Sequence, residues 1–132
     1  MHLIKTFFFI AALASFSFIT IERDLFQSWQ FIGDRKVNFL IDRDVIHVTG
    51  NDNYRQIKLK VTNGPVHILD MDIYFENGDK FDVAIRSRIP QGGESRVIDL
   101  PGGSRSIKKI EFWYETKGFK KGRARVAVWG RR

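Results

Sequence analysis

The chain has 132 residues and no cysteine, and its 22 Lys and Arg residues exceed its 15 Asp and Glu residues to give a net charge of +7. Without cysteine it can form no disulfide framework, no thiolate nucleophile and no cysteine-linked lipid anchor. A hydrophobic share of 43% suffices for one buried core in a chain of this length. The composition therefore predicts a single domain that its core alone must stabilise.

The first twenty-one residues form an apolar segment in which Lys5 is the only strong charge. Residues 7–21 carry no charge, and small residues lie among them, with a small-x-small site at residues 12–14. This pattern is typical of a secretory signal, and the run is shorter than the roughly 20 apolar residues of a spanning helix. The sequence predicts a signal peptide at residues 1–21, with an open cleavage point, and export of residues 22–132 to the periplasm or outside the cell. An uncleaved N-terminal anchor is the alternative.

Apolar and polar residues alternate through most of residues 22–132, which is typical of strands with one buried face. Clusters of Gly, Pro, Asn and Asp separate these runs at regular intervals. They lie at residues 33–34, 50–53, 63–65, 77–79, 90–93 and 101–103. The pattern predicts an all-β domain, an antiparallel β-sandwich of about seven to nine strands, with a closed β-barrel as the alternative.

One hairpin can be predicted in register. A three-residue loop at residues 77–79 would place Phe75 opposite Phe81 and, on the other face, Glu76 opposite Lys80. The same register would set Asp70 against Arg86, and opposite charges facing across two strands are favourable. Just before this run the apolar phase slips by one residue, which predicts a β-bulge or strand break near Leu69.

Positive charge is concentrated at the C-terminal end. Residues 22–103 carry 11 Lys and Arg against 13 Asp and Glu, whereas residues 104–132 carry 10 against 2. A basic loop bordered by aromatic residues suits a polyanion, because charge supplies salt-sensitive affinity and aromatic faces can stack. The predicted binding residues are Lys117, Lys120, Lys121, Arg123 and Arg125, with Trp113 and Trp129 for stacking.

Strand alternation favours placing these two tryptophans together on one surface. An exported location makes an anionic glycan or a lipid headgroup a better partner than nucleic acid. A solvated loop that keeps the domain soluble is the alternative interpretation of the basic residues.

Four aspartates could supply oxygen ligands to calcium, which needs six or more: Asp42, Asp44, Asp70 and Asp72. The dense spacing of a dedicated calcium loop is absent from the sequence. Charges on solvated strand faces are the favoured interpretation, and a calcium-stabilised sandwich is kept as the alternative.

A Pro-Gly-Gly turn lies between Arg96 and Arg105, with Asp99 beside it. The planar guanidinium matches a carboxylate, so the sequence predicts an Arg–Asp clamp that braces this turn. Outward-facing arginines that hold an anionic ligand are the alternative.

His47 and His67 are the histidines outside the signal segment, and each lies within a predicted strand without a nucleophile or paired acid beside it. We expect both to be packed or hydrogen-bonded in place. The sequence therefore predicts a protein that is not an enzyme and that uses no cofactor.

Five short patterns resemble a family of small exported bacterial all-β proteins that is classed as a domain of unknown function. They are Trp29 with Gly33, Asp42-x-Asp44-x-Ile46-x-Val48, Ile57-Lys58-Leu59-x-Val61, Ser95-Arg96-x-Ile98-Asp99-Leu100, and Arg105-x-Ile107-x-x-Ile110-x-Phe112-x-Tyr114. The resemblance covers most of residues 29–129. It implies a periplasmic or secreted all-β domain, and it implies no activity, cofactor or catalytic residue.

The leading hypothesis is a non-enzymatic binding or accessory module at the cell envelope, with a basic C-terminal face for anionic ligands. The alternative is a calcium-stabilised sandwich for glycan recognition. An enzyme of a type that the sequence does not reveal comes third.

Overall fold

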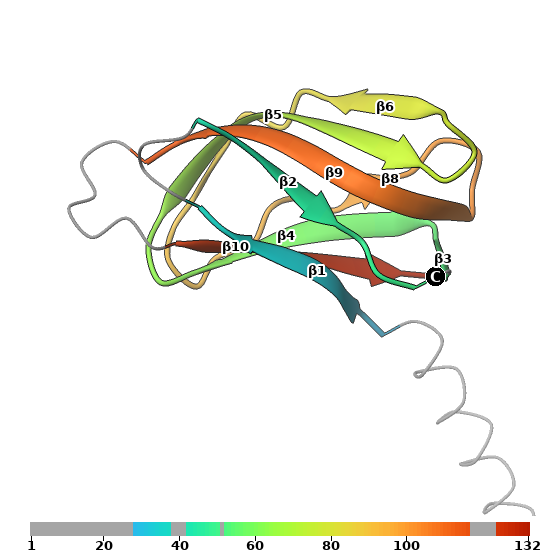
Figure 1. The fold of residues 1–132 in the computed structure, drawn as a ribbon. Coiled ribbons are helices and arrows are strands. Elements are labelled where there is room, and N and C mark those ends of the chain that lie inside the picture. Colours follow the sequence, from blue (N-terminus) through green and yellow to red (C-terminus); the bar gives the residue numbers. More distant parts are fainter. Residues whose placement is uncertain (1–27, 38–41, 51, 117–123) are drawn as a thin grey trace, which may run out of the picture.

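The computed structural model describes residues 28–37, 42–50, 52–116 and 124–132, which form ten β-strands and no helix (Figure 1). The strands are β1 (Gln30–Lys36), β2 (Arg43–His47), β3 (Asn53–Tyr54), β4 (Gln56–Thr62), β5 (Val66–Phe75), β6 (Lys80–Val83), β7 (Ser87–Ile89), β8 (Ile98–Asp99), β9 (Arg105–Glu115) and β10 (Arg125–Arg131). Over these ranges there is also no helix long and apolar enough to cross a membrane. The predicted signal segment lies outside the described residues.

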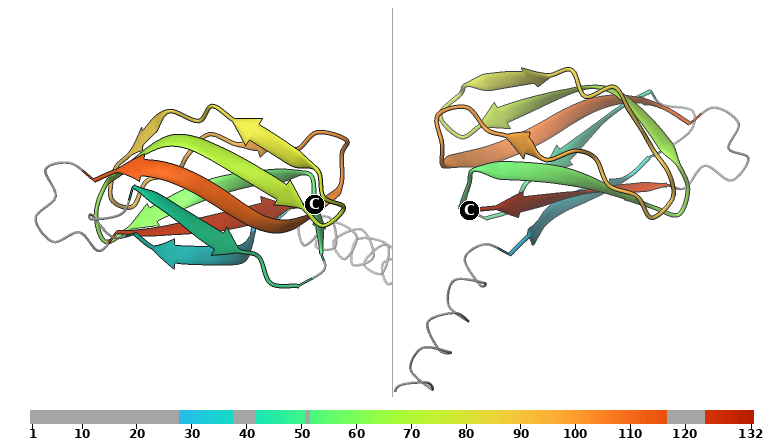
Figure 2. Two further views of the ribbon diagram at one scale, coloured as in Figure 1. Left: turned by 45° about the horizontal axis from the view of Figure 1, so that its top comes forward. Right: turned by 180° about the vertical axis from the view of Figure 1, so that it is seen from behind.

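Two antiparallel sheets pack face to face (Figures 1 and 2). One sheet has the order β1-β10-β4-β8, and the other has the order β2-β9-β5-β6, with β3 added on β9 and β7 added on β5. The sheets stay separate, so the predicted β-sandwich is confirmed and the closed barrel is wrong. Ten strands exceed the seven to nine expected because β3 and β7 have only two and three residues, too few to show alternation.

The core lies between the sheets and follows the period-two pattern of the sequence. In β4, for example, Ile57, Leu59 and Val61 are at most 1% exposed, while the lysines between them lie on the outer face. Each buried aliphatic side chain contributes about 1.5–3 kcal/mol relative to leaving it exposed. The same alternation that builds the core therefore decides which side chains the outer faces carry.

The predicted irregularity near Leu69 is confirmed. The register between β5 and β9 shifts between Ile68 and Asp70, so Leu69 is the extra residue of a β-bulge. Its carbonyl accepts a hydrogen bond of 3.2 Å from the backbone N–H of Arg86, outside the regular ladder.

The predicted register of the β5–β6 hairpin is wrong by two residues. Ile73 pairs with Phe81 and Met71 with Val83, so neither the Glu76–Lys80 nor the Asp70–Arg86 pair forms. The loop does have three residues, but they are 76–78, because Gly78 takes the position with positive φ (93°) that closes the turn. The backbone demand at this glycine outweighs the charge matching on which the prediction rested.

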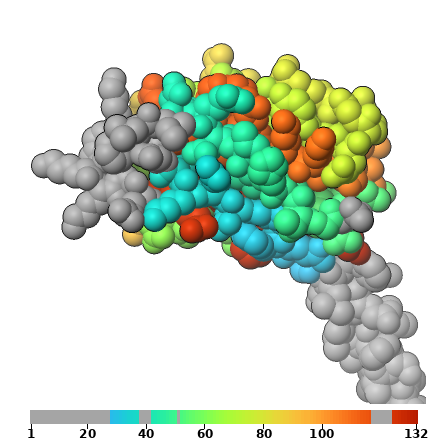
Figure 3. Space-filling model, in the orientation of Figure 1, coloured from blue at the N-terminus to red at the C-terminus, as the bar shows by residue number. Residues whose placement is uncertain are grey.

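The two sheets are joined along the edge where β1 and β2 lie side by side (Figure 3). Arg35 of β1 reaches the buried Asp44 of β2, with 2.9 Å between Nε and Oδ1. The hydroxyl of Tyr114 donates a hydrogen bond of 3.1 Å to the other oxygen of the same carboxylate. A buried carboxylate needs such partners, and the contact with Arg35 also links the two sheets through side chains.

Candidate binding face

Aromatic and basic side chains gather on the outer face of the β1-β10-β4-β8 sheet. We call this surface the aromatic-cation face and define it by six residues: Trp29, Phe31, Lys58, Lys60, Trp129 and Arg131. Trp129 is central, because its register partners are Phe31 on β1 and Lys58 on β4. Directly opposed residues of a sheet point to the same side, so these three side chains share one face.

A bulge in β1 is what turns Phe31 outward. The register with β10 moves from Phe31–Trp129 to Gly33–Val128, which leaves Ile32 as the extra residue. Ile32 is buried at 3% exposure, whereas Phe31 is 54% exposed. The bulge thus fills the core and still presents an aromatic ring to solvent.

The aromatic rings of this face contact one another and the cations. Phe31 and Trp129 meet edge to face, with ring centroids 5.8 Å apart and planes at 74°. The Lys60 ammonium lies 4.5 Å from the Trp129 ring centroid. Trp29 receives two cations, the Lys58 ammonium at 4.4 Å and the Arg131 guanidinium at 4.6 Å.

Each such contact is worth about 0.5–1 kcal/mol at an exposed site. The rings therefore hold the cations in place, which reduces the entropy lost when a ligand binds them.

The face retains positive charge after its internal pairing. Glu94 is shared by Lys58 at 2.9 Å and Lys60 at 3.5 Å. The hydrogen bond from Lys58 and the charges of both lysines hold the pKa of Glu94 below its usual value. Arg131 donates to the amide oxygen of Gln56, whose nitrogen in turn donates to Asp99 at 2.6 Å. Three cations thus stand against two carboxylates, and Arg131 reaches its carboxylate only through a neutral amide.

The residues predicted for binding are separated by the fold. Trp129 lies on the aromatic-cation face, but Trp113 belongs to β9 of the other sheet, where it is half-buried on the outer side. The expectation that the two tryptophans lie together is wrong, because β9 and β10 are in different sheets. Arg125 is ion-paired with Asp34 at 2.6 Å. Lys117, Lys120, Lys121 and Arg123 lie outside the described residues.

Arg105 braces a turn, but not with the predicted partner. Its Nη2 lies 2.8 Å from Asp79 Oδ2, its Nη1 donates to the carbonyl of Pro101, and its guanidinium stacks 4.0 Å from the centroid of Phe75. Asp99 instead accepts from Gln56, and Arg96 is exposed. Hydrogen bonds from Asn77 and Arg105 lower the pKa of Asp79. The clamp therefore joins the β5–β6 hairpin to the turn before β9, a contact between segments distant in sequence.

The four carboxylates of the calcium hypothesis do not converge. Asp44 points into the sandwich edge and is held by Arg35 and Tyr114, whereas Asp72 lies on the outer face beside Lys80. Asp70 lies on the same outer face as Asp72, and Asp42 is exposed just before β2. Among the residues that the structure describes, no group of three or more His, Asp or Glu side chains could hold a metal ion. The structure therefore does not bring the four aspartates of the calcium alternative together in one site.

The two histidines differ in their surroundings. His47 is exposed, so the expectation of a packed side chain is wrong for it. His67 is half-buried on β5, and its Nδ1 lies 3.7 Å from Oε2 of Glu115 on β9. His67 is therefore held by its strand neighbour, as predicted.

A family model described as "Domain of unknown function (DUF2541)" matches residues 6–130. The chain belongs to this family. The family resemblance drawn from the sequence patterns is thereby confirmed as far as a domain of unknown function. A search of the curated proteins found no match.

Solved structures resemble the DUF2541 chain at low sequence identity. AlgX of Pseudomonas aeruginosa is 16% identical with a TM-score of 0.51, over 78% of this chain and 27% of AlgX. A structure of infectious bursal disease virus, Gx strain, is 13% identical with a TM-score of 0.41, over 79% of this chain and 30% of that one. CpGH89CBM32-4 of Clostridium perfringens is 14% identical with a TM-score of 0.45, over 80% of this chain and 95% of that one. The likeness to AlgX shows a shared fold and no shared function.

Most residues of the aromatic-cation face were not identified by sequence reasoning on this DUF2541 chain. The alternation predicted Lys58 and Lys60 on the solvent-facing side of a strand, but not as part of a site. Trp29 was noted only as part of the family pattern. Phe31 precedes a bulge that no alternation indicates. What joins these residues is cross-strand register between β1, β10 and β4, and β1 and β10 are almost a hundred residues apart.

Proposed function

We propose that this protein is a non-catalytic binding module at the cell envelope that binds an acidic glycan on the aromatic-cation face. The observation that carries the proposal is the stacking of Lys58, Lys60 and Arg131 on two outward-facing indole rings. Lys58 is largely covered, whereas Lys60 remains partly exposed, and the three cations together exceed the carboxylates that pair with them. They suit a ligand that carries fixed negative charge.

Each part of the face has a role in such binding. The ammonium of Lys60 and the guanidinium of Arg131 bind the carboxylates of successive uronate units. The exposed ring of Phe31, set against Trp129, supplies an apolar surface for the C–H groups of a sugar. Such a site gains much of its affinity from charge, and salt therefore weakens it.

Two features of the sequence support the location and the charge preference. The apolar segment at residues 1–21 has the character of a secretory signal, and a chain without cysteine needs no oxidative folding after export. The basic stretch at residues 117–125 would add long-range attraction for the same anionic ligand.

Glu94 is the carboxylate that pairs with the lysines of this face. It lies beside the ammonium groups of Lys58 and Lys60, which lower its pKa. Its role is to fix Lys58 and Lys60 in position.

The test is binding of the full chain to polygalacturonate, with dextran as a neutral polymer, at low and high salt. We expect binding to polygalacturonate that weakens with salt and no binding to dextran. The variant Phe31→Ala/Lys60→Ser/Trp129→Ala should lose the binding. The matched control Lys80→Ser/Trp113→Ala, which alters the opposite outer face, should keep it. Equal loss in both variants, or binding that is unchanged by salt, would contradict the proposal.

Two further arms separate the sources of anionic charge. A variant with Lys117, Lys120, Lys121 and Arg123 changed to Ser tests the basic stretch, and we expect a smaller loss than from the face variant. Anionic vesicles presented beside neutral ones test a lipid headgroup as the ligand. Binding to anionic vesicles with none to polygalacturonate would replace the glycan by a lipid surface.

A further inference from the structure

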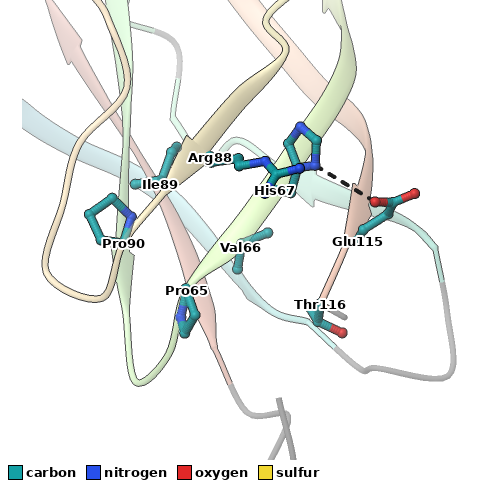
Figure 4. Close-up of a pocket in the computed structure, with 8 residues that line it drawn as sticks. All are labelled: Pro65, Val66, His67, Arg88, Ile89, Pro90, Glu115 and Thr116. Carbon is teal, nitrogen blue, oxygen red and sulfur yellow. Dashed lines mark ion pairs between the residues drawn. The ribbon is translucent and has the colours of Figure 1, made fainter. Parts of the chain in front are cut away.

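A pocket of about 430 Å³ lies at the end of the sandwich where the chain turns from β4 into β5 (Figure 4). Its size falls within the range of about 300–1,000 Å³ that holds small ligands. It is formed by strands of the β2-β9-β5-β6 sheet together with the loops at Pro65 and Pro90, and it includes no residue of the aromatic-cation face. It is therefore a second and separate site.

Three polar side chains cross this pocket in one row. Arg88 of β7 is the register partner of His67 on β5, and His67 is the register partner of Glu115 on β9. Neighbouring strands lie about 4.8 Å apart, so the backbones of Arg88 and Glu115 are separated by about 9–10 Å. A positive group thus stands at one end of the row and a negative group at the other.

The two end groups are available to a ligand in different degrees. Within the described part of the chain the side chain of Arg88 forms no ion pair or hydrogen bond, and it is exposed. Glu115 Oε2 lies 3.7 Å from Nδ1 of His67, and the Glu115 side chain remains 51% exposed. A free guanidinium binds a carboxylate by two parallel hydrogen bonds, and a half-exposed carboxylate can accept from an ammonium group.

The pocket also has an apolar border. Val66 and Ile89 lie beside the polar row, but each is only 2% exposed, so their side chains face the core. Pro65 and Pro90 border the pocket itself, and proline presents a rigid ring without a backbone donor. An apolar side chain of the ligand would therefore find a surface that loses no hydrogen bond on being covered.

We propose that this pocket binds a dipeptide with free ends, its carboxylate on Arg88 and its ammonium on Glu115. An extended dipeptide spans about 7 Å, and the side chains of Arg88 and Glu115 bridge the remaining distance between the strands. In a single amino acid the two charges lie too close together to reach both ends of the row. An apolar second residue packs on the rings of Pro65 and Pro90.

The experiment is isothermal titration of the full chain with Gly-Leu, N-acetyl-Gly-Leu and Gly-Leu amide. We expect one saturable site for Gly-Leu and affinities about tenfold lower for each blocked form, because each loses one charge-assisted pair. Methyl shifts of Val66 and Ile89 in the presence of Gly-Leu should locate the ligand.

Two variants separate the ends of the ligand. Arg88→Gln should abolish the preference for the free carboxylate over the amide, and Glu115→Gln should abolish the preference for the free amine over the acetylated form. Arg96→Gln, an exposed arginine outside the pocket, is the matched control and should bind as the unaltered chain does.

Absence of saturable binding up to millimolar Gly-Leu, or equal affinity for all three ligands, would overturn the proposal. Binding that Arg88→Gln leaves unchanged would do the same. The triple variant of the aromatic-cation face should retain dipeptide binding, so failure of the glycan proposal and failure of this one are distinguishable.

Discussion

The two outer faces of the sandwich have the same strand geometry and opposite chemistry. On the aromatic-cation face, indole rings lie beneath cations that exceed the local carboxylates. On the opposite face, Trp113 borders a pocket of about 480 Å³ with three aspartates: Asp70, Asp72 and Asp82. We call this second surface the acidic face. An outward tryptophan on a sheet does not by itself decide what the sheet can bind.

The difference lies in how the cations are neutralised. The acidic face also has cations near an aromatic ring, since Lys109 and Lys80 lie 4.7 and 6.0 Å from the centroid of Tyr74. There, however, Lys80 sits between Asp72 at 3.4 Å and Asp82 at 3.5 Å, and Arg43 is paired with Glu111 at 2.6 Å. Around these cations the carboxylates are in excess, so the acidic face offers little positive charge to an anionic ligand. The two faces therefore differ in the net charge that remains after their cations and carboxylates have paired with one another.

The largest expected effect sets one tryptophan against the other. Trp129→Ala should weaken polygalacturonate binding about tenfold or more, because it removes both the stacking surface and the support of Lys60. Trp113→Ala should leave the affinity unchanged. The measurement is the dissociation constant of each variant at low salt, and an equal loss from both would end the distinction between the faces.

The second prediction concerns the interior that both faces share. Gly130 of β10 packs on Tyr54 of β3, and a Cβ at Gly130 would lie 2.6 Å from Cδ1 of that ring. Gly130→Ala should destabilise the fold by about 1–3 kcal/mol through overpacking. Urea unfolding followed by tryptophan fluorescence measures this, since Trp113 reports on one sheet and the other two tryptophans on the other.

A single shifted transition is expected if the faces belong to one cooperative unit. The control is Tyr54→Ala, in whose background the added methyl at residue 130 should cost much less. Two separate transitions in Gly130→Ala would show that the sheets unfold independently.

The third prediction concerns how the contribution of Glu94, on the aromatic-cation face, to the stability of the fold depends on pH. The lysines beside Glu94 lower the pKa of that carboxyl in the folded state. A lowered pKa contributes stability that is present above the unfolded value and lost as pH falls through the folded value. Glu94→Gln should therefore lower the melting temperature at pH 7 and make little difference near pH 3, in unfolding scans at both pH values. An equal effect at both would contradict the assignment.

The fourth and smallest expected effect is on the acidic face, where removing the charge of a carboxylate should stabilise the fold at pH 7 instead of destabilising it. Burial, and then the hydrogen bond with Asp82, raise the pKa of Asp72. A raised carboxyl pKa means that the charged form destabilises the fold above the folded value, and that this cost disappears as pH falls below the unfolded value. Asp72→Asn should thus raise the melting temperature slightly at pH 7 relative to the unaltered chain and lose that advantage near pH 3. A lower melting temperature at pH 7 would show that the Lys80 contact dominates instead.

Local sequence was a good guide where the deciding interaction is local. Alternation in β4 and β5 predicted which residues are buried, and the slip of one residue predicted the bulge at Leu69. The hairpin register was missed because the turn geometry at Gly78 competed with charge pairing and prevailed. The amino-acid composition of the two strands does not indicate whether turn geometry or charge pairing has the larger effect on the register.

The candidate site could be predicted only in part. Trp129 was identified, but its partners Phe31 and Lys60 come from β1 and β4, strands that meet β10 only in the folded sheet. Arg105 was recognised as a brace, and its true partner Asp79 lies on a hairpin 26 residues away. Contacts between residues of different strands depend on the order of strands in the sheet. The alternation of apolar and polar residues within a strand does not specify that order.

The sequence by itself determined an all-β sandwich, its buried residues and the basic C-terminal charge, because hydrophobic period and turn residues act within a few positions of each other. Only the tertiary structure decided which outward side chains become neighbours. It assigned β9 and β10 to different sheets and so parted Trp113 from Trp129. The physical reason is that core burial specifies which side of each strand faces inward, whereas strand order specifies what lies beside it on the outside.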